Sequence, residues 1–181
     1  TAPPTRTQTP SVVQSISQCL FEPAREFNRI WTGFQDELGC PVQQAVGGQF
    51  AEQSFEDGYM IWSGILDQFY VMIDEEKGPW YWFDRKEVES FGARNGEVAC
   101  RPPSSVPDDR YQPISGFGGI WCAREDIQEE IGWDTEKEIA VLDNLLQTFE
   151  NGFLLRDSRG FVYVLISDRD ERGGVYIREP R

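Results

Sequence analysis

The sequence contains no histidine, the residue that most often serves as a general base, a catalytic-triad member or a metal ligand. It also contains no GxSxG, HExxH or P-loop pattern. No stretch approaches the roughly 18 apolar residues that a membrane span requires. We therefore expect a protein that is not an enzyme, with no cofactor, no metal site and no direct membrane insertion in this segment.

Basic residues are scarce, with 17 Lys and Arg against 31 Asp and Glu and a formal net charge of −14. Binding to nucleic acid needs a cationic surface that releases counterions from phosphate, so no nucleic-acid partner is expected. The same sign of charge disfavours docking on anionic lipid. Solubility is the simplest interpretation of the excess of acidic residues.

Cysteine is rare but even in number. With no CxxC pair and no histidine, two disulfides are preferred over a zinc site, and disulfides require an oxidising compartment. Among the three connectivities, sequential pairing is preferred because short loops close most readily. The alternative to disulfides is four reduced thiols in a cytosolic protein. The sequential pairing is Cys19–Cys40 with Cys100–Cys122, and Cys19–Cys100 with Cys40–Cys122 would instead link the two halves of the chain.

Residues 1–18 contain no aromatic residue and are rich in Thr, Pro, Ser and Gln. Such a segment cannot bury enough surface to fold, which predicts a disordered stalk or linker. Because the chain begins at Thr1 and not at Met, we expect an N-terminal anchor upstream that tethers the protein to a cell surface. A spacer between two soluble domains is the alternative. With the disulfides, the stalk predicts an exported protein that is extracellular or at the cell surface.

The chain contains two similar series of motifs in the same order, which predicts an internal duplication. Both series begin with an aromatic residue two positions before Pro and continue to an Ile-Trp pair. Both then contain a Phe-Glu-x-Gly turn and an apolar strand. The matching segments are 21–31 with 111–121, 53–61 with 147–155, and 69–73 with 162–166.

Each copy is expected to contain a short amphipathic helix followed by a small antiparallel meander. The helix ends at Gly39 in the first copy and at Gly132 in the second, and Gly-containing turns separate the strands. A meander has one apolar face, which the other copy would cover. The sequence thus predicts an α+β fold of two tandem repeats related by a pseudo-twofold axis, each with its helix packed on its meander. One compact unit would comprise repeat 1 at 19–83, a connector at 84–110 and repeat 2 at 111–181.

The first copy contains Leu38-Gly39-Cys40-Pro41 followed by FEDGYMIWS at residues 55–63. This pattern resembles the LGFP-type repeats of bacterial cell-envelope proteins, which combine a short Trp-bearing helix, an L-G-x-P turn and an F-x-x-G-x-[IM]-x-W strand pair. The resemblance covers most of residues 28–73 and, more loosely, 118–166. It implies an extracellular, non-catalytic module that anchors a protein to cell-wall glycan or to another envelope protein.

Three tryptophans of the first copy, Trp62, Trp80 and Trp82, form the predicted ligand or partner site. Trp62 aligns with Arg156, so its position is expected to be partly exposed in both copies. Trp80 and Trp82 alternate along one strand and share a face. Several exposed rings together mark a binding site. The alternative is that the connector or the second copy covers these rings, which are then core residues.

Glu56 and Glu150 are the equivalent acids of the two copies, and an enzyme of the carboxylate-dependent glycosidase type would use such a pair. We prefer the interpretation that each begins a tight turn, where acids are locally favoured. The expected function is therefore an extracellular binding or anchoring module, including a sensor ectodomain. A structural or accessory subunit of an envelope assembly is the second hypothesis, and a glycosidase is the third.

Overall fold

The computed structural model describes residues 19–102, 104–168 and 173–180. The stalk predicted at residues 1–18 lies outside the described residues. The described chain contains four short helices and ten strands, and neighbouring strands pair antiparallel throughout. The predicted α+β class with mostly antiparallel strands is confirmed.

The elements form two runs, and in each run helical structure precedes five strands. Helix α2 lies between the two runs, in the segment that was predicted to be a connector. The bounds in chain order are α1 Asn28–Leu38, β1 Val46–Gly47, β2 Phe50–Phe55, β3 Gly58–Ser63, β4 Gln68–Ile73, β5 Lys77–Asp84, α2 Arg85–Ser90, α3 Ser115–Ala123, α4 Glu125–Ile131, β6 Ile139–Val141, β7 Leu145–Phe149, β8 Gly152–Arg156, β9 Val162–Ser167 and β10 Gly173–Glu179.

Glycine ends α1 and α4 at the predicted places. Gly39 has φ +73° and Gly132 has φ +75°, a region that residues with a Cβ rarely adopt. The indole N–H of Trp31 donates to the Gly39 carbonyl at 2.9 Å, and that of Trp121 donates to the Gly132 carbonyl at 2.8 Å. Each buried tryptophan therefore satisfies a carbonyl that the helix end leaves without an intrahelical partner. The single helix expected in the second copy is divided at Arg124, whose φ and ψ of −115° and 87° are not helical.

The strands form one sheet in the order β1-β7-β8-β9-β10-β5-β4-β3-β2-β6. Strands β2 to β5 of the first run are consecutive neighbours, as are β7 to β10 of the second, and the two series meet where β5 pairs with β10. Strand β1 of the first run pairs with β7, and β6 of the second run pairs with β2. Each run thus places its first short strand at the far edge of the other run's strands.

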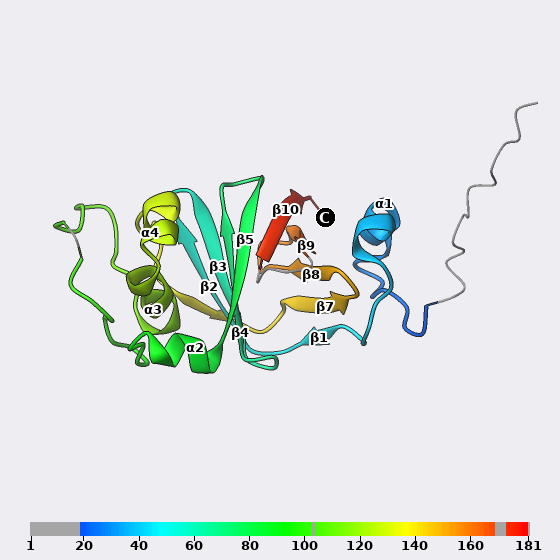
Figure 1. Cartoon of the computed structure of the whole chain (residues 1–181), viewed down its shortest axis with the longest axis horizontal. Helices are drawn as coiled ribbons and strands as arrows, with labels where there is room; N and C mark the ends of the chain where they lie inside the picture. Colours follow the sequence, from blue (N-terminus) through cyan, green and yellow to red (C-terminus); the bar gives the residue numbers. More distant parts are fainter. Residues whose placement is uncertain (1–18, 103, 169–172, 181) are drawn as a thin grey trace, which may run out of the picture.

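The helices also pack on the strands of the other run. Figure 1 shows α3 and α4 at one end of the molecule and α1 at the other, with the curled sheet between them. The expectation that each helix packs on its own meander is therefore wrong. The reason is that the segment after each helix extends through β1 or β6 to the opposite half. The helix meets a similar apolar surface on its own strands and on those of the other run, so the sequence pattern does not distinguish the two arrangements. The α3/α4 core combines Phe117, Ile120, Trp121, Ile127 and Ile131 with first-run residues such as Met60, Phe69 and Phe83, and the α1 core combines Phe27, Ile30, Trp31 and Leu38 with Phe149, Leu154, Val162 and Val164.

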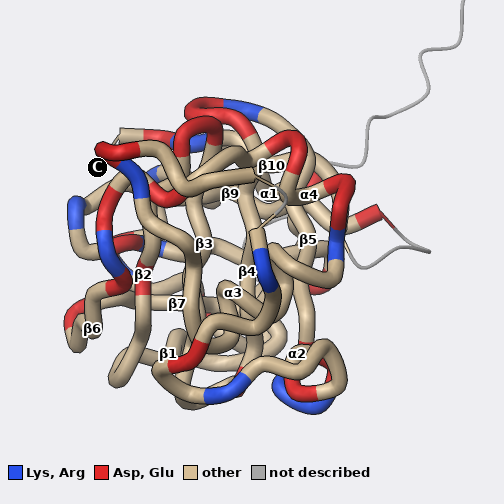
Figure 2. The backbone as a smooth tube through the Cα atoms, turned by 90° about the vertical axis from the view of Figure 1, so that its left-hand side faces the viewer, with Lys and Arg blue, Asp and Glu red and all other residues tan. Residues whose placement is uncertain are grey.

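A third cluster, the central core, lies between the two strand series. It is rich in large aromatic side chains, including four tyrosines, and the rings of Tyr59 and Tyr176 both contact that of Tyr163. Charged residues concentrate in the loops and in helices such as α2 and α4, and the strands carry few of them (Figure 2). The central core consists of Phe50, Tyr59, Ile61, Tyr70, Met72 and Trp80 from the first run with Leu146, Leu155, Tyr163, Leu165 and Tyr176 from the second.

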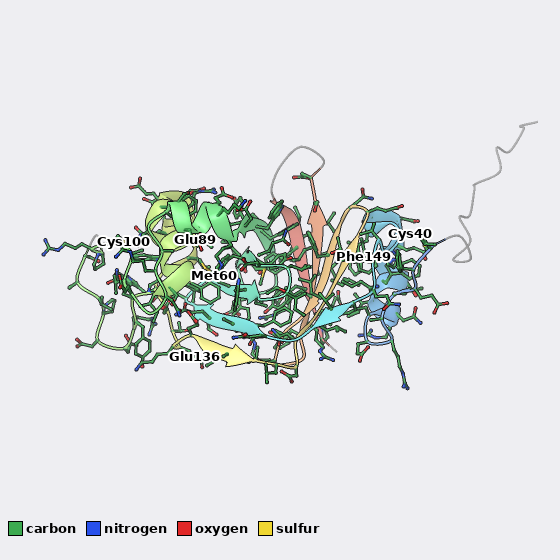
Figure 3. The ribbon with its side chains drawn as sticks, turned by 90° about the horizontal axis from the view of Figure 1, so that it is seen from below. Cys40, Met60, Glu89, Cys100, Glu136 and Phe149 are labelled. Atoms are coloured by element: carbon green, nitrogen blue, oxygen red, sulfur yellow. A yellow bond between two sulfur atoms is a disulfide. The ribbon has the colours of Figure 1, made fainter. Side chains whose placement is uncertain are left out.

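Both disulfides have the preferred sequential pairing, Cys19–Cys40 and Cys100–Cys122. The first joins the segment before α1 to the loop after it, and the second joins the connector to α3. Figure 3 shows Cys40 and Cys100 at opposite ends of the molecule. Two disulfides suggest an oxidising environment. Among the described residues, no helix is long and apolar enough to span a membrane.

Candidate binding pocket

A cavity of about 310 Å³ lies over the ends of β2, β3 and β6, between these strands and the start of α3. Small residues line the cavity where the strands and the helix approach each other. A Cβ atom at Gly116 would lie 2.3 Å from the Phe69 ring, so only glycine permits this approach of α3. The lining residues are Gln49, Phe50, Ala51, Trp62, Phe69, Arg85, Asn95, Ser115, Gly116, Phe117, Glu138 and Ala140.

One wall of the pocket is aromatic. Trp62 on β3 and Phe69 on β4 are opposite each other in the strand register, and their ring centroids are 6.3 Å apart. Phe117 of α3 meets Phe69 edge to face at 5.8 Å. These contacts hold the rings in fixed positions and give the pocket an apolar surface.

Asp67 holds the guanidinium group of Arg85 beside this wall. Its carboxylate accepts a hydrogen bond from the Trp62 indole N–H at 3.2 Å and from Arg85 Nε at 2.8 Å. The Arg85 guanidinium lies 4.9 Å from the Trp62 ring centroid and 5.4 Å from that of Phe69. A guanidinium that is both ion-paired and stacked is restrained in orientation.

Glu138 contributes a carboxylate to the same pocket. Its Oε2 atom is buried and has no hydrogen-bond partner among the described residues, and burial raises the pKa of this carboxyl. Nearby, Asp134 is fully buried and accepts a short hydrogen bond from the side-chain amide of Gln53. Burial raises the pKa of Asp134 to about 8, and the charge of Glu138 adds to this effect. The strand side of the pocket therefore holds one poorly solvated carboxyl group, that of Glu138, and Asp134 lies outside the lining.

Of the three predicted site tryptophans, only Trp62 lines this pocket. It is partly exposed, as is Arg156, in agreement with the expectation from the alignment. Residues of the connector and of the second run, namely Arg85 and Phe117, line the pocket beside it and leave the cavity open.

Trp80 and Trp82 share a face, as predicted, but it is the face opposite to that of Trp62. Trp80 is 0% exposed in the central core, where its indole N–H donates to the Ile166 carbonyl at 2.9 Å. Trp82 is partly buried and packs against the same core. The prediction of one surface formed by all three rings is wrong. The reason is the strand register, which pairs Trp62 with Phe69 and Phe69 with Phe83. These three side chains therefore face α3 and α4, whereas Trp80 and Trp82 face the central core.

Glu56 and Glu150 occupy the two helix–turn contacts of the fold. Glu56 accepts a hydrogen bond from the Trp133 backbone amide at 3.0 Å, and Glu150 accepts one from the Cys40 amide at 3.0 Å. The Trp133 amide and then the Arg110 side chain hold the pKa of Glu56 below its usual value. A general acid requires the opposite shift. The geometry therefore assigns these two carboxylates to holding loops in place.

Glu52 and Asp157 form a second buried polar cluster, in and beside the central core. The Glu52 carboxylate accepts hydrogen bonds from the Tyr59 hydroxyl at 2.7 Å and the Ser158 amide at 2.9 Å. Asp157 accepts from the Phe161 amide and from Arg159 Nε, both at 2.9 Å. Because these carboxylates are well supplied with donors from both runs, the cluster links the two halves of the molecule.

The sequence did not single out Asp67, Arg85, Phe117 or Glu138. Phe117 belongs to a repeated motif that predicts core packing, and Glu138 is one of many acids without a distinguishing pattern. Arg85 follows the aromatic strand β5 directly, and this position was the only available signal.

No protein-family model matches the chain, and neither a curated protein nor a solved structure matches it.

Proposed function

We propose that the chain is an extracellular, non-catalytic binding or anchoring module, and that a group projecting from its partner enters the pocket beside Trp62. The observation that carries this proposal is an open cavity with an aromatic wall, an oriented guanidinium and a buried carboxylate oxygen without a partner. Sites for small groups combine these features. The partner is cell-wall glycan or another envelope protein, as the resemblance to LGFP-type repeats implies.

We further infer that the two halves are copies of one unit that exchanged their helices and first strands. The strand order supports this inference, since it is unchanged when β1 to β5 are replaced by β6 to β10 and read in reverse. The two helix–turn contacts support it as well. The backbone bonds from Glu56 to Trp133 and from Asp57 to Ile131 have counterparts from Glu150 to Cys40 and from Asn151 to Leu38, with N–O distances of 2.9 to 3.0 Å.

If the halves are copies, each has an equivalent position for such a pocket, and the proposed binding site is the one that contains Trp62. In the other position, the alignment places Arg156 at the position of Trp62 and Leu145 at that of Ala51. A leucine fills space that alanine leaves open. After a duplication, side chains that differ between the two positions are the pattern expected of a site with a task in one copy alone.

Co-sedimentation with insoluble bacterial cell-wall material tests the proposed function. The wild-type protein should sediment with the wall, and Trp62→Ala should weaken this binding about tenfold, as truncation of a central aromatic residue does. Trp82→Ala is the matched control, because it removes a partly buried tryptophan from the opposite face of the sheet. A thermal melt of each variant confirms folding. Equal losses in the two variants, or no sedimentation of the wild type with wall or envelope extract, would contradict the proposal.

A structural subunit is a second candidate, favoured by exposed apolar residues at one edge of the sheet. Ile139 is 49% exposed on the short edge strand β6, and Leu142 directly after it is 77% exposed. Exposed strand edges promote association between chains. If this edge mediates assembly, light scattering should detect oligomers whose size rises with concentration, and Leu142→Lys should abolish them.

A further inference from the structure

We propose that the pocket beside Trp62 recognises a small zwitterion of amino-acid or dipeptide size. In this proposal Arg85 binds the carboxylate of the ligand and Glu138 binds its ammonium group. The aromatic wall of Trp62, Phe69 and Phe117 contacts its apolar part. The inference rests on the proposed function, because it names the ligand chemistry of the same pocket.

Arg85 supplies the anion-binding end. Its Nε is bound to Asp67 at 2.8 Å, and the two terminal nitrogens of the guanidinium have no hydrogen-bond partner among the described residues. These two nitrogens form the planar fork that matches a carboxylate. The backbone amides of Gly116 and Phe117, in the first turn of α3, add donors that the helix itself leaves free.

Glu138 supplies the cation-binding end. Its buried Oε2 atom lacks a donor, and a buried acceptor without a donor costs free energy that a ligand N–H would recover. Ala140, two residues later, pairs with Ala51 on the neighbouring strand, so the strand surface beside Glu138 is formed by small side chains. Glu138 as a whole is partly exposed and lines the cavity, so a ligand ammonium group can approach its carboxylate from there.

The two charged ends do not satisfy each other. Arg85 is ion-paired with Asp67, and no ion pair joins Arg85 to Glu138, although both line one cavity. An anionic ligand would leave the buried Glu138 oxygen without a donor, and a cationic ligand would leave the terminal nitrogens of Arg85 without an acceptor among the described residues. The cavity of about 310 Å³ lies at the small end of the usual range for ligand sites, which fits one amino acid or a dipeptide.

Isothermal titration calorimetry with the common L-amino acids and their glycyl dipeptides tests the inference. At least one of these zwitterions should bind the wild type, and its N-acetylated and C-amidated forms should bind about tenfold more weakly because each lacks one charge. Glu138→Gln should remove the preference for the free ammonium, and Arg85→Gln should remove the preference for the free carboxylate. The matched controls are Glu136→Gln and Arg94→Gln, which remove like charges outside the pocket and should leave both preferences intact.

The outcomes separate this inference from the proposed function. If no zwitterion binds while the protein still sediments with wall material through Trp62, the ligand chemistry is wrong and the binding function stands. If the blocked forms bind as well as the zwitterion, or if the control variants change the preferences equally, the two charged ends have no role. Binding of a zwitterion without any sedimentation supports the ligand chemistry and overturns anchoring to the wall.

Discussion

The ends of α1 and α4 meet the opposite half of the molecule through the same backbone contacts, yet different side chains surround them. We call the contact of residues 38–42 with 148–151 the α1 junction and that of residues 131–135 with 54–57 the α4 junction. In each, a glycine with positive φ allows the next amide to bond a glutamate at 3.0 Å. Both junctions thus require a glycine at the helix end and a glutamate carboxylate that accepts from the following amide.

The neighbouring side chains stabilise the two junctions in different ways. At the α1 junction, Cys40 is joined to Cys19 by a disulfide, and Pro41 follows it. At the α4 junction, Trp133 packs on Trp121 with ring centroids 5.0 Å apart, and Arg110 pairs with Glu56 at 2.8 Å. The comparison teaches that a backbone arrangement can be kept while covalent linkage is exchanged for packing and ion pairing.

Removal of a disulfide should destabilise the protein more than any single substitution at the junctions. The loops closed by Cys19–Cys40 and Cys100–Cys122 span 21 and 22 residues, so replacing either pair by serine should lower the free energy of unfolding by about 3 kcal/mol. Only the first pair belongs to a junction. Hydrogen exchange should therefore show faster exchange of the α1 junction amides in the variant that lacks Cys19–Cys40 and not in the variant that lacks Cys100–Cys122. An equal increase in the two variants would contradict this assignment.

Alanine at either junction glycine should cost about 2 kcal/mol, because it combines a positive φ with a steric conflict. A Cβ atom would lie 2.3 Å from Glu150 Oε2 at Gly39 and 2.5 Å from Glu56 Oε2 at Gly132. Gly33→Ala is the control, since Gly33 lies in α1 with no atom within 4 Å of a Cβ, and it should stabilise the protein slightly. Urea unfolding measures all three. A Gly39→Ala cost similar to that of Gly33→Ala would show that the junction tolerates rearrangement.

Asp134 should make the α4 junction sensitive to pH. Burial raises its pKa to about 8, whereas the unfolded chain ionises near the ordinary aspartate value. Between about pH 4 and pH 8 the folded state therefore binds more protons than the unfolded state, and stability falls as pH rises, by at most about 1.4 kcal/mol per pH unit. Asp134→Asn should flatten this decline in urea unfolding curves measured across the window. The exposed Asp36→Asn is the control, and parallel pH profiles for Asp134→Asn and the wild type would contradict the prediction.

The smallest effect is expected from replacing the two junction glutamates by glutamine. The amide keeps an acceptor oxygen but loses the charge, so Glu56→Gln should cost about 1 kcal/mol and Glu150→Gln about half of this, because only Glu56 is paired with an arginine. The difference should shrink at high salt, which screens the pair with Arg110. Equal costs at all salt concentrations would mean that the ion pair contributes nothing to the α4 junction.

Much of the fold was predictable because it depends on local pattern. The glycines at 39 and 132, the Glu-x-Gly turns and the apolar strand segments all lie where the sequence places them. Loop length favoured the disulfide pairing that the structure shows, but it left the other two connectivities open. The candidate site was not, since it required knowing that Trp62 faces α3 while Trp80 faces the central core. That division depends on how β3, β4 and β5 align, and alternation within one strand carries no information about the register of its neighbours.

The sequence by itself therefore determined most of the helix ends, strands and turns, since these depend on neighbours close along the chain, and it favoured the sequential cysteine pairing while leaving the other connectivities open. Only the tertiary structure decided that each helix packs on the other half. It also decided that Arg85, Phe117 and Glu138 meet Trp62 around one cavity. The physical reason is that the two halves carry similar apolar surfaces, so the local pattern does not distinguish packing within a half from packing between halves. The length and path of the segments after α1 and α4 then select between the two arrangements.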